Sequence, residues 1–238
     1  MQGVDHQPLL LLENAMLNPG RSYRSRGFTL VEIAIVLVII GLLLGGVLKG
    51  QELINSAKAK AVVNDFRNTM TMIAAYQDRF RQWPGDDSAA DTRLPNNTAR
   101  LKGNGNGQIE GSWRDAGNGG SSSEARAVWL HLRLANLATG STDTSSTDYA
   151  PRNSEGGIIG VQSHSSAFAN LNGRLVICQD GISGRIALQV DSSMDDGNPD
   201  AGSVQFGTWS DNGALVPATL GTNGTFSDSQ AYVICTAT

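Results

Sequence analysis

The longest uninterrupted apolar stretch of the chain lies near its N-terminus. Residues 28–48, FTLVEIAIVLVIIGLLLGGVL, are apolar except for Thr29 and Glu32, and they contain no proline. As an α-helix this stretch would be roughly 30 Å long, which is the thickness of the hydrocarbon core of a bilayer. The pattern therefore predicts a single membrane-spanning helix over 28–48.

Beyond residue 48 the apolar positions become periodic. They recur every three or four residues, which is typical of one face of an amphipathic helix: Ile54, Ala57, Ala61 or Val62, Phe66, Met70, Ile73, Gln77 and Phe80. The proline and glycine in the segment 83–87, WPGDD, then predict the end of the helix. We expect one helix of roughly 80 Å from Phe28 to about Gln82. Its amphipathic half, 49–82, should pack on a globular head.

The remaining chain, 83–238, alternates between polar loops and short apolar segments. A helix is predicted after the loop 102–123, because Ser121 and Glu124 fit a capping box and Gly140 follows as a stop. Strands are predicted over 157–162, 174–179, 203–209 and 231–236. This order of elements predicts an α+β head with an antiparallel sheet.

Two details of the head are expected from local sequence. Asn172-Gly173 fits a tight hairpin turn before the second strand. Residues 184–194 fit both a strand alternation and a helix face. We favour a helix, because Ser183 can cap its start and Asp195-Asp196-Gly197 can end it.

Local charge orients the predicted membrane helix. Arg21, Arg24 and Arg26 precede it, whereas Lys49 alone follows it directly. Because cationic flanks stay in the cytoplasm, residues 1–27 are expected there and the bulk of the chain on the other side of the membrane. The whole chain has a formal net charge of -4, which argues against attraction of the entire protein to nucleic acid.

The junction ahead of the apolar stretch has a specific sequence, Gly27-Phe28-Thr29-Leu30-Val31-Glu32. With basic residues before it and an apolar helix after it, this junction resembles the signal of type IV prepilins and type II secretion pseudopilins. The resemblance implies that a prepilin peptidase cuts between Gly27 and Phe28, that residues 1–27 are a removed leader, and that the Phe28 amine is methylated. Met16 is an alternative start that would shorten the leader and keep its three arginines.

Glu32 is the one carboxylate of the apolar stretch. Placing a carboxylate in a membrane helix costs about 2.5 to 3.5 kcal/mol on insertion scales, so it needs a partner or a role. The resemblance implies that Glu32 pairs with the Phe28 amine of a neighbouring subunit during assembly. The alternative is a side chain near the helix end that reaches the membrane interface.

The two cysteines, Cys178 and Cys235, both lie in apolar strand-like segments, LVIC and YVIC. Two cysteines exclude a zinc site held by four thiolates and leave one disulfide or two free thiols. An exported head lies in an oxidising compartment, which favours the pair. The resemblance to pilins, which commonly hold their C-terminal region with one disulfide, also implies it.

A carboxylate cluster follows the predicted helix 184–194. Calcium takes six to eight oxygen ligands, and such a loop could supply several. The candidate ligands are Asp191, Asp195, Asp196 and Asp200. The alternative is an Asp-rich turn after a helix, and the absence of EF-hand spacing favours that alternative. No other cofactor is expected.

Catalytic and nucleic-acid signals are weak. The sequence contains no HExxH or GxSxG motif and no strand-linked GxGxxG, so we expect no enzyme. A patch of basic residues beside Trp83 would suit a DNA-binding competence pilin. The patch contains few charges, so we favour the alternative that these are ordinary solvent-exposed residues at the end of a helix. Its candidate residues are Arg79, Arg81, Arg93, Arg100 and Lys102.

These features predict a structural subunit that self-associates into a type IV pilus-like filament. Its expected partners are the prepilin peptidase and the pilus or secretion assembly machinery of the inner membrane. The chain would lie in that membrane before assembly and in an extracellular filament afterwards. The main alternative is a pseudopilin of a type II secretion system, which would remain periplasmic. A membrane-anchored enzyme and a DNA-binding competence pilin are more distant alternatives.

Overall fold

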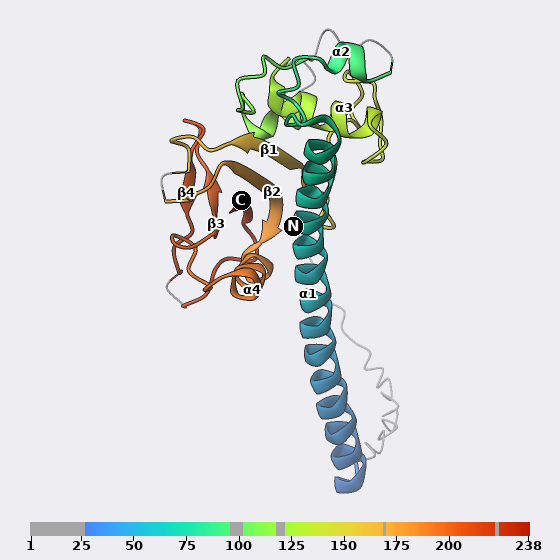
Figure 1. Ribbon diagram of the computed structural model, residues 1–238. Helices are drawn as coiled ribbons and strands as arrows, with labels where there is room; N and C mark the ends of the chain where they lie inside the picture. The colour runs from blue at the N-terminus through green and yellow to red at the C-terminus, as the bar shows by residue number, and fades with distance from the viewer. Residues whose placement is uncertain (1–26, 96–101, 118–121, 169, 222–223) are drawn as a thin grey trace, which may run out of the picture. The chain divides into compact units, whose positions relative to one another are not determined.

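The computed structural model describes residues 27–95, 102–117, 122–168, 170–221 and 224–238 (Figure 1). The chain divides into two compact units, one ending at Gly46 and the other comprising Val47–Thr238. Helix α1, Leu30–Phe80, contributes to both units. The fold is α+β, as the sequence predicts: a long N-terminal helix followed by a head with a five-stranded antiparallel sheet.

The first half of α1 is exposed within the part of the chain that the structure describes. Its most apolar window has a mean hydropathy of 2.8, and none of the residues in this window is buried. Leu30 is 86% and Leu42 73% exposed. Within the described part of the chain, α1 is the one helix that is long and apolar enough to cross a membrane. Such a surface needs lipid or other helices around it.

The second half of α1 buries one stripe of side chains in the head: Ala59, Val62, Val63, Phe66, Thr69, Ile73 and Tyr76. The centre of the predicted stripe is confirmed at Phe66 and Ile73. Its first position is wrong, because Ile54 is 57% exposed, and Tyr76 rather than Gln77 is the buried residue. Phe80, its last position, is partly buried against the core. With 3.6 residues per helical turn, either residue 76 or residue 77 can continue the stripe, and packing against the head buries Tyr76.

The sheet has the strand order β1-β2-β5-β3-β4, and every neighbouring pair is antiparallel. The strands are β1 (Ile159–Ser163), β2 (Leu175–Ser183), β3 (Val204–Trp209), β4 (Leu215–Pro217) and β5 (Ala231–Ala237). Four correspond to the predicted strands. The short edge strand β4 was not predicted, because three residues are too few to show an alternating pattern.

Alternating side chains of the central strands cover both faces of the sheet. On β2, Leu175 and Ile177 belong to the larger core that includes the buried stripe of α1. Val176 and Cys178 belong to a smaller core on the opposite face, together with Trp113. The sheet is therefore buried on both sides in its centre, and the larger core holds it against α1.

Two helices complete the head, α3 (Glu124–Leu134) and α4 (Gly184–Met194), with the short helices α2 (Ala90–Arg93) and η2 (Trp113–Gly117). The predicted helix 184–194 is confirmed, although Ser183 makes no side-chain capping bond. The capping prediction for α3 is corrected: its N-cap is Ser123, whose side chain accepts from the Arg126 N–H. Ser121 lies outside the described residues.

The predicted tight turn at Asn172-Gly173 is also corrected. Ser163 of β1 pairs with Leu175 of β2, so residues 164–174 form the connection between the strands. This longer loop contributes Phe168 and Leu171 to the smaller core. Gly173 is needed for another reason, because a Cβ there would lie 2.7 Å from the side chain of Ala237.

The two cysteines form a disulfide between adjacent central strands. Cys178 of β2 and Cys235 of β5 are direct register partners, and both are fully buried. The bond joins residues separated by 57 positions in the sequence. It therefore fixes the C-terminal strand to the middle of the sheet.

Replacing both Cys178 and Cys235 by serine should lower the free energy of unfolding by about 4 kcal/mol, because the bond closes a long loop in the unfolded chain. Urea denaturation of the detergent-purified protein, followed by tryptophan fluorescence, measures this change. Wild-type protein unfolded with reductant is the matched control and should behave like the double variant. An unchanged midpoint in both samples would contradict the stabilising role.

Candidate functional site

The signal junction lies at the start of α1. Gly27, Phe28 and Thr29 precede the helix, and Leu30 and Val31 begin it. Phe28 is 82% exposed, and Leu30 and Val31 are also exposed. The peptide bond between Gly27 and Phe28 thus lies just outside the helical hydrogen-bond pattern.

Thr29 and Glu32 form a reciprocal capping box at this end of α1. The Glu32 N–H donates to Thr29 Oγ1 at 3.2 Å, and the Thr29 N–H donates to Glu32 Oε2 at 2.8 Å. The Thr29 hydroxyl donates to the same carboxylate oxygen at 2.9 Å. These bonds satisfy backbone N–H groups that the first helical turn otherwise leaves free.

The capping box gives Glu32 a function within its own subunit that the sequence interpretation missed. The pattern Thr-x-x-Glu at 29–32 was a sufficient signal for it. A carboxylate near a helix N-terminus also interacts favourably with the helix dipole. The arrangement holds the Glu32 carboxylate four residues after Phe28, within the first turn.

A second constellation lies where α1 ends. The segment 83–87, which we call the WPGDD turn, leads from the end of α1 into the head. The Gly85 N–H donates to Nδ1 of the buried His131 on α3 at 2.9 Å. Gly85 has φ +94°, and a Cβ there would lie 2.5 Å from the Glu124 carbonyl oxygen. His131 is therefore a structural residue of this contact.

Asp86 holds the glycine-rich loop 103–108. Its carboxylate is fully buried and accepts the N–H groups of Gly105, Asn106 and Gly107 at 2.7, 3.1 and 2.7 Å. Three charge-assisted bonds compensate the loss of hydration. The loop thus presents N–H donors to an internal carboxylate.

Asp87 connects the same turn back to α1. Its Oδ2 accepts the Tyr76 hydroxyl at 2.9 Å, and its Oδ1 accepts from Arg93 at 3.1 Å. Burial, and then the hydrogen bond and charge of Asp87, raise the pKa of Tyr76 far above its ordinary value. Tyr76 therefore remains a neutral hydrogen-bond donor, and the turn is fixed to the last turns of α1.

The predicted basic patch is not a free cationic surface. Each described cation has a partner within the chain: Arg79 donates to the Ala135 carbonyl, and Arg81, Arg93 and Lys102 pair with Asp78, Asp87 and Asp91. Arg100 lies outside the described residues. Because three of these four cations pair with carboxylates, the geometry gives little support to a nucleic-acid interface.

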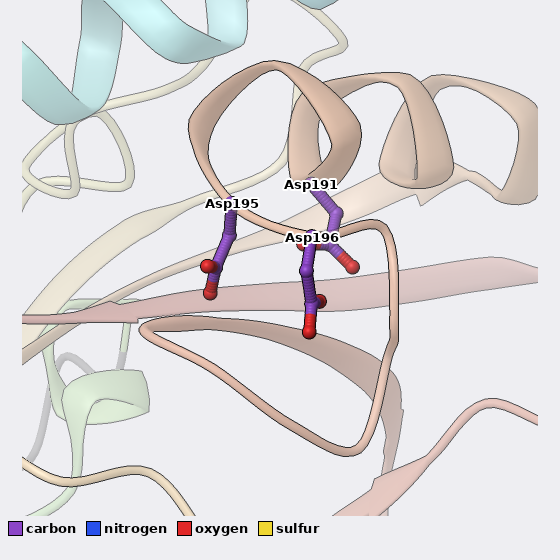
Figure 2. Close-up of side chains that lie close together, drawn as sticks. All are labelled: Asp191, Asp195 and Asp196. Atoms are coloured by element: carbon purple, nitrogen blue, oxygen red, sulfur yellow. The ribbon is translucent and has the colours of Figure 1, made fainter.

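Three of the four predicted calcium ligands come together at the end of α4 (Figure 2). Asp191, Asp195 and Asp196 each offer one carboxylate oxygen, and these oxygens lie within 4.8 Å of one another. Asp200 is not part of this group, since its carboxylate accepts from the Asn170 amide at 2.8 Å.

Asp191 has the most unusual environment of these carboxylates. Burial raises the pKa of Asp191 to about 6, the Gly197 N–H acts in the opposite direction, and the charges of Asp196 and Asp195 raise it further. The cluster therefore combines a buried carboxyl group with two further acidic side chains.

Comparison with known proteins finds one related feature. Residues 22–48 match the family model described as the prokaryotic N-terminal methylation motif. The chain thus carries the prepilin signal of type IV pilins and pseudopilins. No curated protein and no solved structure has significant similarity to this chain.

Replacing Asp86 by alanine should destabilise the head by about 3 kcal/mol or more, because three buried N–H groups lose their acceptor. The control is Asp78→Ala, which removes a carboxylate whose side chain is 82% exposed and which pairs with Arg81 at 3.6 Å. Its effect should be much smaller. Urea denaturation compares the two variants, and equal midpoints would contradict the role of Asp86.

Proposed function

We propose that the chain is a structural subunit of a type IV pilus-like filament, anchored in the inner membrane by the first half of α1 before it assembles. The observation that carries this proposal is the prepilin signal placed directly on an apolar helix that no described residue buries. The signal and the fold point to a structural subunit of a non-enzymatic kind. Both features fit membrane anchoring before assembly.

Processing prepares the assembly contact. The prepilin peptidase cuts between Gly27 and Phe28, and this cut creates a free amine at Phe28, which is then methylated. Glu32 supplies the opposite charge one turn further along. In an apolar bundle of helices, a charge pair is far stronger than in water, so the Phe28 amine of one subunit and the Glu32 carboxylate of the next define their relative stagger.

The capping box supports this role, because it gives the Glu32 carboxylate hydrogen-bond donors before a neighbouring subunit binds. Thr29 provides two hydrogen bonds to Oε2. The cost of the carboxylate in the apolar segment is thereby reduced in the unassembled subunit. On assembly the second carboxylate oxygen remains available to accept from the neighbouring amine.

Two kinds of filament use such a subunit. A pilus subunit would be abundant in filaments sheared from the cell surface. A type II secretion pseudopilin would remain periplasmic, and its loss would block the export of folded proteins. Isolation of surface filaments, with identification of their main component, separates these two kinds.

The first prediction concerns processing. The mature protein should begin at Phe28 and carry one N-methyl group, because the junction has the sequence that the peptidase requires. Mass spectrometry of the intact mature chain and of its N-terminal peptide measures both features. The Gly27→Ile variant, with its side chain at the cleaved bond, should retain residues 1–27 or the shorter leader from Met16. A chain cut after Gly46 would contradict the proposal.

The second prediction concerns Glu32. The Glu32→Leu variant should be inserted and cleaved normally, since an apolar residue favours membrane insertion, but it should form few or no filaments. Glu32→Asp keeps the charge and shortens its reach, so its filament yield should be intermediate. Immunoblots of membrane and sheared fractions measure both steps. Wild-type filament yield from a normally cleaved Glu32→Leu protein would refute the pairing role.

A further inference from the structure

A polar pocket of about 280 Å³ opens on the head, where the glycine-rich loop 103–108 meets the end of β1 and the start of β2. Its lining contains no aliphatic side chain, no aspartate and no glutamate: it consists of Asn106, Gly107, Gln108, Ser163, His164 and Arg174. The volume lies near the lower limit of ordinary ligand pockets, about 300 Å³. The pocket therefore suits a small polar molecule rather than an apolar group.

Arg174 gives this pocket a cation without an acidic partner. Its guanidinium forms no ion pair with any carboxylate of the described chain. The guanidinium carbon lies 5.8 Å from the centre of the Trp83 ring, and a Cβ at Gly107 would lie 4.0 Å from Nη2 of Arg174. The ring and the loop thus orient the side chain. A planar guanidinium with free N–H groups binds a carboxylate through two parallel hydrogen bonds.

The backbone around the pocket is fixed by hydrogen bonds within the head. The Ile109 N–H donates to Ser163 Oγ at 2.7 Å, and the Ser163 N–H donates to the Ile109 carbonyl at 3.0 Å. On the other side of the loop, the buried Asp86 carboxylate accepts the Gly107 N–H at 2.7 Å. A pocket whose walls are formed in advance loses less conformational entropy when a ligand binds.

The other groups in the lining are hydrogen-bonding groups that a simple anion would leave unused. The oxygen of the Ser163 hydroxyl accepts a backbone N–H, so its hydrogen is available to donate. Gln108 and His164 add an amide and an imidazole, which can donate as well as accept. Asn106 is already bonded to Glu110 at 2.8 Å. A matching ligand carries a carboxylate together with several hydroxyl groups.

We propose that this pocket binds a sugar acid, with Arg174 holding the carboxylate and with Gln108 and Ser163 bonded to ring hydroxyl groups. A neutral sugar would leave the guanidinium unpaired, whereas acetate would leave the amide and hydroxyl groups without partners. Both should therefore bind more weakly than a sugar acid. This inference concerns the head alone and does not depend on filament assembly.

The full chain, purified in a detergent that has no sugar head group, tests the site by ligand-observed NMR titration. Glucuronate or galacturonate should bind saturably and change the tryptophan fluorescence, because Arg174 contacts Trp83. Glucose and acetate should each bind roughly tenfold more weakly or worse. Equal binding of glucose would overturn the recognition of a carboxylate. Equal binding of acetate would overturn the assignment to a sugar acid.

Variants locate the binding within the chain. Arg174→Gln changes an exposed residue, so it should keep the wild-type melting temperature and weaken binding of the sugar acid roughly tenfold or more. Gln108→Ala should weaken it less. Arg67→Gln, the same change at an exposed arginine outside the pocket, should bind like the wild type. The proposal is overturned if neither sugar acid binds to the wild type, or if Arg174→Gln binds as tightly as Arg67→Gln.

Discussion

The packing of one stripe of α1 against the head is the interaction on which the rest of the structure depends. The first half of this helix is strongly apolar, and no described residue buries its most apolar window. The second half buries a single face, centred on Phe66 and Ile73, in the same core as the sheet. A continuous helix can serve both environments because its surface changes from uniformly apolar to amphipathic without a break in the backbone.

Polar contacts fix the position of the head along that stripe. The Gln179 side chain donates to the Val62 carbonyl at 3.0 Å, and Lys58 pairs with Glu155 at 2.8 Å. At the end of the helix, Tyr76 is bonded to Asp87 in the WPGDD turn. Apolar packing alone is not directional, so these bonds specify one register of the helix against the head.

The WPGDD turn shows how carboxylates can build structure without catalytic chemistry. Asp86 and Asp87 are fully buried, yet Asp86 accepts backbone N–H groups and Asp87 accepts hydrogen bonds from the backbone and from neighbouring side chains.

The sequence by itself determined the features that depend on local pattern and on solvent. The junction at 27–32, the apolar span, the amphipathic continuation and four of the five strands follow from charge asymmetry, from side-chain periodicity and from the solvation of apolar groups in lipid.

The tertiary structure decided which distant groups meet. Tyr76 rather than Gln77 is buried, Asp86 holds the glycine loop, Cys178 faces Cys235, and Asp191 joins two neighbours but not Asp200. Each of these outcomes depends on neighbours from other segments, whose positions are set by packing of the whole core.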